Sequence, residues 1–188
     1  MSTIKELARK NRSYRRFYEE KQITREMLVD LVDAARTTPS GANKQPVRFI
    51  ISWESAKNEL IFETLRWAGY YSDWDGPEAG ERPSGYIVLV EPKGSNAAWD
   101  EGIIGQTILL AAVEKGLGGC FIANIDREKL EANLALPQDY SVKLVIALGF
   151  PKEEVVIETI NAGDDIKYYR DDNQVHHVPK IRLEDLIL

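Results

Sequence analysis

Apolar residues recur every three or four positions in five segments, a spacing that is typical of helices packed against a core. The expected helices cover residues 3–10, 24–36, 54–67, 99–115 and 126–134. Thr3 and Glu6 fit a capping box at the start of the first helix. The helix over 99–115 is apolar on nearly all sides, which indicates burial on most of its surface. Gly102 and Gly105 inside it indicate that another backbone approaches closely.

Shorter apolar segments predict strands, because they are rich in β-branched and aromatic residues. The expected strands cover residues 47–52, 86–90, 119–123 and 142–150. The continuous apolar runs at 86–90 and 142–150 predict central strands that are buried on both faces. The sequence shows no internal repeat and no linker, so we expect one α+β domain over residues 1–188 with at least four strands.

The C-terminal part, from about residue 151 to residue 188, contains no long periodic segment. We expect it to form an extended arm that ends in a short amphipathic stretch over 183–188. An arm of this length has no core of its own and must pack against something. A second subunit is the obvious candidate.

The composition limits the class of protein. Of 188 residues, 44% are hydrophobic and 29% are charged, values that are typical of a globular domain and exclude a disordered or collagen-like chain. No apolar run approaches the roughly 20 residues that span a bilayer, and the first residues lack the apolar core of a signal peptide. The single cysteine, Cys120, excludes an internal disulfide. These features favour a soluble cytoplasmic protein without a membrane partner.

The net charge of −6 hides an uneven distribution. Residues 1–50 carry eleven Lys and Arg against six Asp and Glu, a balance of +5, whereas the rest of the chain has a balance of −11. A general nucleic-acid binder usually shows a basic face overall, so we expect no nucleic-acid partner. A local anionic ligand fits the basic segment better, and chance clustering of solvated charges is the alternative.

Several familiar catalytic motifs do not occur in the sequence. It has no GxxxxGK[ST] phosphate loop, no GxSxG and no HExxH, and the glycines at 116–119 only half match a dinucleotide-binding motif. His176 and His177 are adjacent, so on a strand they point to opposite faces and cannot easily share a metal. Cys120 lies among apolar residues and is most simply a core thiol.

Three polar segments remain as candidates for ligand binding. In Asn11-Arg12-Ser13-Tyr14-Arg15-Arg16-Phe17, the alternating residues Asn11, Ser13 and Arg15 point the same way in an extended chain. Arginine and serine together suit phosphate oxygens. The second segment is Pro39-Ser40-Gly41-Ala42-Asn43-Lys44-Gln45-Pro46, and the third is Pro179-Lys180-Ile181-Arg182. Taken singly, the first two segments also fit an exposed basic turn and an ordinary turn before a strand.

Taken together, these segments resemble the nitroreductase family of FMN-dependent flavoproteins. The segment NRSYRRF is similar to the family's R-x-S-x-R/K-x-F phosphate motif, and PSGANKQP is similar to its P-S-x-x-N-x-Q-P loop. The GLG at 116–118, the stretch 121–130 and the closing PKIR follow in the family's order. The resemblance implies a central, mostly antiparallel mixed sheet flanked by helices. It also implies an obligate homodimer, with FMN at the interface and a C-terminal arm exchanged between subunits.

The resemblance also implies roles for particular residues. The phosphate and ribityl chain would be bound by Arg12, Ser13, Arg15, Lys180 and Arg182. Ser40, Gly41 and Asn43 would lie against the flavin from the other subunit, with Gln45 as a further contact, and Ala123 and Asn124 would approach flavin N5 through backbone groups. Two positions depart from the family pattern. Asn11 stands where arginine is common, and Val47 stands where many members have tryptophan.

The expected function is that of an FMN-dependent oxidoreductase that takes hydride from NADH or NADPH. The resemblance implies a small electron-poor acceptor, a nitroaromatic or a quinone, and the chemistry needs no catalytic side chain because FMN performs it. A flavin storage or sensor protein without turnover is the alternative, and reductive dehalogenation or substrate oxidation is a related possibility. The aromatic residues in the loop over 67–85 either form a substrate lid or pack the surface.

Overall fold

Four antiparallel strands form the main sheet of the computed structural model, which describes residues 3–71 and 73–188. Their order across the sheet is β1-β2-β4-β3. The strands are β1 (Arg48–Ser52), β2 (Gly85–Pro92), β3 (Gly118–Ile122) and β4 (Tyr140–Gly149). All four were predicted to within a few residues. The two continuous apolar runs are β2 and β4, which lie in the middle of the sheet.

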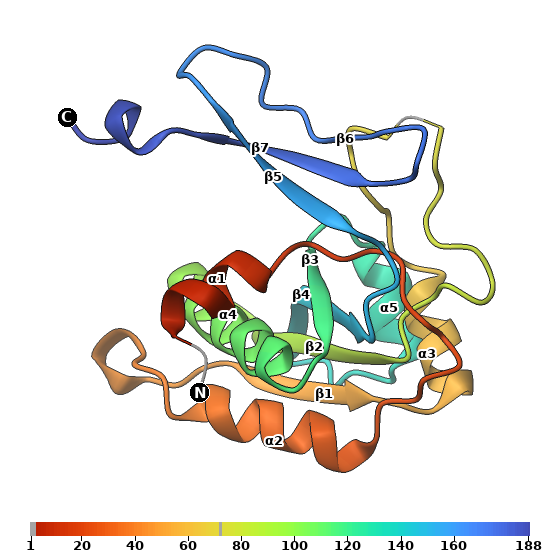
Figure 1. Ribbon diagram of the computed structural model, residues 1–188. Helices are drawn as coiled ribbons and strands as arrows, with labels where there is room; N and C mark the ends of the chain where they lie inside the picture. The colour runs from red at the N-terminus through yellow and green to blue at the C-terminus, as the bar shows by residue number, and fades with distance from the viewer. Residues whose placement is uncertain (1–2, 72) are drawn as a thin grey trace.

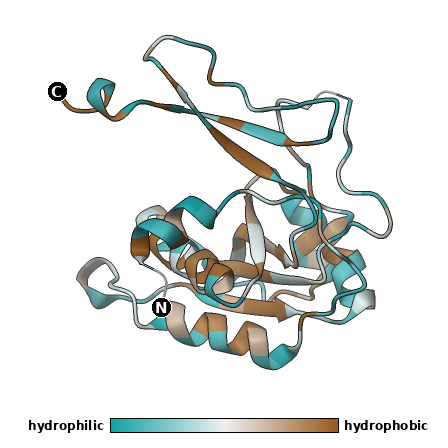
Figure 2. Ribbon diagram, viewed as in Figure 1, coloured by the Kyte–Doolittle hydropathy of each residue, from teal (hydrophilic) through white to brown (hydrophobic). Residues whose placement is uncertain are grey.

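Helices cover both faces of this sheet, which explains why its central strands are apolar throughout (Figures 1 and 2). Helices α2 (Arg25–Arg36) and α4 (Ala98–Glu114) pack on one face, against the side chains of Ile87 and Leu89. Helices α3 (Ser55–Phe62) and α5 (Arg127–Asn133) pack on the other face, where Val88 and Val90 point. The short helix α1 (Ile4–Lys10) lies beside α4. The α+β architecture is therefore confirmed.

Local signals at the helix ends are confirmed as well. The Thr3 hydroxyl accepts from the Glu6 backbone N–H at 3.3 Å, and the Glu6 carboxylate accepts from the Thr3 backbone N–H at 2.8 Å. Gly116 ends α4 with a φ of +75°, a conformation that other residues adopt only with strain. None of the helices in the described ranges is long and apolar enough to cross a bilayer.

Helix α3 is shorter than predicted and ends at Phe62 rather than near residue 67. The chain after it leaves the helix because it bonds to the segment that follows β3. The Arg66 backbone N–H donates to the Asn124 carbonyl at 3.0 Å, and the Thr64 carbonyl accepts from the Asp126 N–H at 2.9 Å. The apolar residues beyond Phe62 therefore keep a helical spacing in the sequence, although the backbone there forms a turn and a single β-bridge.

The C-terminal part, for which we expect an extended arm, contains paired strands that its sequence pattern did not indicate. The C-terminal part forms a second sheet, which lies apart from the main one in Figure 1. Its strands are β5 (Val155–Ile160), β6 (Tyr169–Arg170) and β7 (His176–Ile181), in the order β5-β7-β6. Strands β5 and β7 are parallel. β6 pairs only with His176 and His177, so Pro179 lies in the part of β7 that has a single neighbour.

The chain ends in an exposed apolar tail over residues 183–188, which contains the single-turn helix η2 (Leu183–Asp185). The exposed fractions of Leu183, Leu186 and Ile187 are 66%, 62% and 69%. The tail projects away from both sheets in Figure 1. The predicted amphipathic end is therefore present, and in the single chain its apolar side chains contact water.

A buried carboxylate, Glu153, joins the two ends of the chain where β4 leads into the second sheet. Its side chain accepts hydrogen bonds from the backbone N–H groups of Arg15 and Arg16, the latter at 3.3 Å. It also accepts from Arg170 Nη2 of β6 at 3.0 Å. Because this carboxylate is 1% exposed, its charge depends on these donors for compensation.

Replacing Glu153 by glutamine should destabilise the fold. Glutamine keeps the shape but leaves the Arg170 guanidinium without its counter-charge, and breaking a buried ion pair in this way costs about 3 kcal/mol. Urea denaturation followed by circular dichroism measures the change in the free energy of unfolding. The matched control is E154Q at the exposed neighbouring position, which should be neutral. Equal stability of E153Q and E154Q would contradict the role of Glu153.

Candidate functional site

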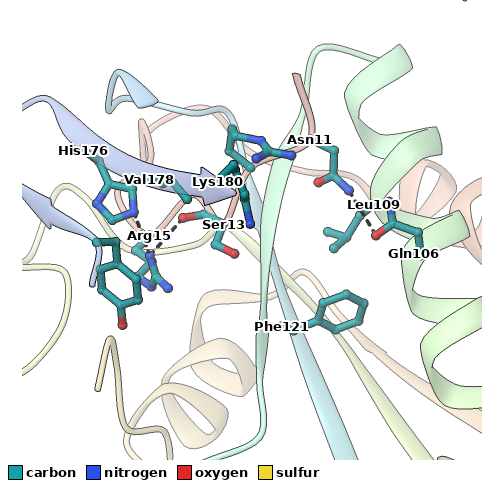
Figure 3. Close-up of a pocket in the computed structure, with 11 residues that line it drawn as sticks. Asn11, Ser13, Arg15, Gln106, Leu109, Phe121, His176, Val178 and Lys180 are labelled. Atoms are coloured by element: carbon teal, nitrogen blue, oxygen red, sulfur yellow. Dashed lines mark hydrogen bonds between the residues drawn. The ribbon is translucent and has the colours of Figure 1, made fainter. Parts of the chain in front are cut away.

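A cavity of about 300 Å³ lies where the segment after α1 meets α4, β3 and β7 (Figure 3). Side chains from both ends of the chain and from its middle point into it. The lining residues are Asn11, Arg12, Ser13, Arg15, Gln106, Leu109, Phe121, Tyr168, His176, Val178 and Lys180. We call this space the cationic cavity.

The charge of the cationic cavity is uniform. Three lining residues, Arg12, Arg15 and Lys180, are cationic, and none of the described lining residues is Asp or Glu. Arg12 Nη2 donates to the Ala8 carbonyl at 2.8 Å, whereas its Nε is buried without a hydrogen-bond partner among the described residues. Burial lowers the pKa of Arg12, because desolvation disfavours its charged form. A bound anion would compensate both the charge and the free donor.

The segment over residues 11–15 is fixed to the start of β3. Ser13 pairs in parallel with Gly119, and the Tyr14 backbone N–H donates to the Gly119 carbonyl at 3.1 Å. As predicted from alternation, Asn11, Ser13 and Arg15 all line the cavity. Arg12 lines it too, because the chain turns tightly there: the Tyr14 N–H also approaches the Arg12 carbonyl at 2.8 Å.

Arg15 is the centre of a hydrogen-bonded chain that leads out of the cavity (Figure 3). Its Nη1 donates to the Ser13 carbonyl at 3.2 Å and lies 3.4 Å from His176 Nε2. Because arginine only donates, His176 Nε2 must accept, and the proton of the neutral ring is then on Nδ1. That nitrogen lies 2.5 Å from the Tyr71 hydroxyl, which therefore accepts from it. The guanidinium also lies over the Tyr168 ring, 4.9 Å from its centroid.

The neutral state of His176 has a clear electrostatic cause. Burial, together with the charges of Arg15 and Arg170, lowers the pKa of His176 to about 4. His177 points to the opposite face of β7, as the sequence predicted, and its ring contacts Glu158 at 2.7 Å and Asp171 at 3.4 Å. Burial opposes protonation there, but the two carboxylates raise the pKa of His177.

A second hollow of about 180 Å³ adjoins the cationic cavity along β3 and shares Arg15, Phe121 and Tyr168 with it. Its remaining walls are the segment 66–69 and the end of β3 with the two residues that follow it, Ala123 and Asn124. β3 is an edge strand of the main sheet, and the Gly119 carbonyl points outward to Tyr14. Alternation then places the backbone groups of Phe121 and Ala123 on the same open edge.

The structure brings together most residues that the sequence singled out. Arg12, Ser13, Arg15 and Lys180 line the cationic cavity, and Ala123 and Asn124 line the adjoining hollow. Arg182 lies one residue beyond β7, bonds through Nε to Asp185 at 2.9 Å and is not among the lining residues. Its role in phosphate binding stays a prediction.

The loop over residues 40–45 lies at a different place. It contains the single-turn helix η1 (Gly41–Asn43), whose Gly41 N–H donates to the buried Asp100 carboxylate at 3.1 Å. Gly41 borders a hollow with residues 94–100, and none of Ser40, Gly41, Asn43 and Gln45 lines the cationic cavity. A contact of these four residues with a ligand in that cavity therefore needs a second subunit and stays a prediction.

The sequence reasoning missed Gln106, Phe121, Tyr168 and His176 as site residues. A signal existed for Phe121, because Gly105 was noted as a point of close approach. A Cβ at Gly105 would lie 2.3 Å from the Phe121 ring, so it is a side chain rather than a backbone that approaches α4 there. A Cβ added at Gly102 would meet no other segment of the chain within 4 Å, so the close approach predicted there is wrong.

The opposite pKa shifts of His176 and His177 predict opposite effects of pH on stability. Between pH 6.5 and about 4, the unfolded chain protonates His176 and the folded chain does not, so its stabilising effect is lost as pH falls. The effect of His177 is present at low pH and is lost as pH rises through its raised pKa.

We expect the fall in melting temperature from about pH 7.5 to about pH 5 to be smaller in H176Q than in the unmodified protein. The matched variant H177Q should show a larger fall, because it removes a group that stabilises the fold at low pH. Differential scanning fluorimetry measures both. An identical fall in all three proteins would show that neither shift contributes to stability.

Comparison with known proteins identifies the family of this chain. The family model described as the nitroreductase family matches residues 8–71, and the model described as putative TM nitroreductase matches residues 79–181, which is more than half of the chain. The two segments that line the cationic cavity from opposite ends of the chain, 11–15 and 176–180, lie within these matched ranges.

Individual relatives agree with the family models. A putative NADH dehydrogenase/NAD(P)H nitroreductase of Archaeoglobus fulgidus is 27% identical over 148 residues, covering 74% of this chain and 80% of the relative. An iodotyrosine deiodinase of Thermotoga neapolitana is also 27% identical and covers 81% of this chain and 91% of the relative. The structure of a nitroreductase family protein from Clostridium novyi NT superposes with a TM-score of 0.68 at 26% identity, covering 80% and 86% of the two chains. This chain belongs to the nitroreductase family.

Proposed function

We propose that this protein is an FMN-dependent oxidoreductase that takes hydride from NADH or NADPH and reduces a small electron-poor acceptor. The observation that carries the proposal is the cationic cavity, where three cations and no described carboxylate meet in a chain whose net charge is −6. Two relatives support it by name. One is an FMN-dependent nitroreductase of Clostridium difficile, 26% identical with a TM-score of 0.64, and the other is the putative NADH dehydrogenase/NAD(P)H nitroreductase of Archaeoglobus fulgidus.

The residues of the site fit FMN. A phosphate dianion matches Arg12, Ser13 and Lys180, and it would provide an acceptor for the unpartnered Arg12 Nε. The amides of Asn11 and Gln106, which contact each other at 3.3 Å, offer polar groups for ribityl hydroxyls. The adjoining hollow shares three lining residues with the cavity and is walled by aromatic rings, which suits a planar ring system.

FMN would supply the hydride chemistry when bound, and the chain's own residues would orient and stabilise it. The outward backbone groups near Ala123 can hold the edge of a ring in a fixed plane. Arg15 brings a positive charge to the junction of cavity and hollow, and its bonds to Ser13 and His176 keep that charge in one position. Phe121 and Tyr168 line both spaces, so their rings can pack against a planar ligand at this junction.

We also propose that the working unit is a homodimer. The exposed apolar tail over 183–188 needs a covering surface, and the loop over 40–45 can meet the cationic cavity only from another subunit. Deleting residues 183–188 should shift the mass measured by light scattering after gel filtration from two chains toward one. The control L60A removes an exposed apolar residue of α3 and should leave the mass unchanged. A full-length protein of one chain's mass that binds FMN would contradict the dimer.

Binding of FMN is the first test of the proposed function. R15A and K180A should each weaken FMN binding by about tenfold or more, because each removes a charge-assisted contact. Quenching of FMN fluorescence during titration measures the affinity. The control K167A removes an exposed lysine of the same C-terminal part and should have no effect. Protein that is colourless and remains so after FMN titration would overturn the proposal.

Reduction of the bound flavin separates the enzyme from a flavin store or sensor. Holoprotein mixed anaerobically with NADH or NADPH should lose its flavin absorbance, and an electron-poor acceptor should restore it. A spectrum that neither nucleotide changes would favour the storage or sensor function. The acceptor panel should include halogenated aromatics besides nitroaromatics and quinones, because the Thermotoga neapolitana relative is an iodotyrosine deiodinase.

A further inference from the structure

A hollow of about 330 Å³ lies outside the cationic cavity, between the loop before β2 and strand β6. Its described lining residues are Tyr70, Tyr71, Asp73, Trp74 and Arg170, and we call it the aromatic pocket. Tyr168 lies between the two spaces. Its ring centroid is 4.9 Å from that of Tyr70 and 5.3 Å from that of Tyr71, while it also lines the cationic cavity and the adjoining hollow.

The walls of the aromatic pocket suit a flat ring. The Tyr71 and Trp74 rings meet edge to face at 6.0 Å, and Trp74 in turn meets Trp67 at 6.5 Å. Trp67 is 7% exposed and also lines the hollow next to the cationic cavity. The aromatic wall is therefore continuous from the proposed flavin site to the pocket, and a further ring can pack against it edge to face or by stacking.

Arg170 brings a positive charge to this apolar pocket. Its guanidinium lies 5.2 Å from the centroids of both the Tyr71 and the Trp74 rings. One of its nitrogens, Nη2, contacts Glu153 at 3.0 Å, but Nε is buried without a hydrogen-bond partner among the described residues. Glu153 also accepts from the backbone N–H groups of Arg15 and Arg16, so its charge is shared among three donors. A bound anion would satisfy the free donor of Arg170.

The Tyr71 hydroxyl adds a second donor. Because it accepts the Nδ1 proton of His176, its own proton is free to bond to a ligand oxygen. Burial raises the pKa of Tyr71, so the hydroxyl keeps this proton at neutral pH. Asp73 is exposed and is the one carboxylate among the described lining residues. It opposes a second negative charge on the ligand.

We propose that the aromatic pocket binds a planar aromatic monocarboxylate, with the ring against Tyr70, Tyr71 and Trp74 and the carboxylate on Arg170. The inference rests on the proposed function and deepens it, because it names the class of acceptor that the protein prefers. An acceptor held here lies against the same aromatic wall as the proposed flavin site.

Binding of a matched pair of compounds tests the pocket independently of turnover. 4-Nitrobenzoate and 4-nitrobenzamide have the same ring and nitro group and differ in charge. Isothermal titration of the holoprotein should give an affinity for the benzoate about tenfold higher than for the benzamide, since a hydrogen bond to a charged group contributes most of the difference. R170Q should abolish this preference and leave the affinity for the benzamide unchanged.

Because R170Q also removes the contact with Glu153, two further variants test the pocket without altering that contact. D73N removes a repelling charge and leaves Arg170 and Glu153 unaltered, so it should tighten the benzoate about threefold and leave the benzamide unchanged. W74A should weaken both compounds, because it removes part of the ring's wall. Thermal unfolding followed by circular dichroism shows whether the fold of each variant is intact, independently of FMN binding.

The outcomes separate this inference from the proposed function. Equal affinities of the two compounds for the unmodified protein would contradict the proposed pocket. The same holds if neither R170Q nor D73N changes the preference for the benzoate. A normal preference in binding combined with no reduction of the bound flavin by either nucleotide would support the pocket and contradict the enzyme.

Discussion

The buried carboxylate of Glu153 is the contact on which the rest of the site depends. It accepts hydrogen bonds from the backbone N–H groups of Arg15 and Arg16 near one end of the chain and from the Arg170 side chain near the other. Because the donors come from segments more than 130 residues apart, one charge fixes both walls of the cationic cavity. The same interaction sets Arg170 in the aromatic pocket.

The main sheet could be predicted because its elements carry their own signals. β2 and β4 are apolar on both faces, and capping residues such as Thr3 mark the helix starts. The second sheet carries weaker signals. β5 is half-exposed and β7 contains Pro179, so their pairing depends on tertiary contacts that no local pattern encodes. The early end of α3 has the same cause, since hydrogen bonds to Asn124 override the helical spacing.

The same limit applies to the site. Alternation correctly placed Asn11, Ser13 and Arg15 on one side, because that segment is extended against β3. Tyr168 and His176 could not be placed in the cavity, because they reach it only through the folding of the second sheet. The segment 179–182 singled out Lys180 as a candidate, but only the family resemblance placed it at the same phosphate as Arg12, because the two residues lie far apart in the sequence.

The cationic cavity forms only when the C-terminal sheet packs against the N-terminal segment, so retention of a ligand there would depend on that packing. One wall of the cationic cavity comes from residues 168–180. Bringing this wall to segment 11–15 closes a loop of more than 150 residues, and the entropy cost of closure grows with loop length. We therefore expect the contacts between these two segments to form after the more local ones. A ligand held between the two ends would tie them together, so we expect it to protect the C-terminal part from proteolysis.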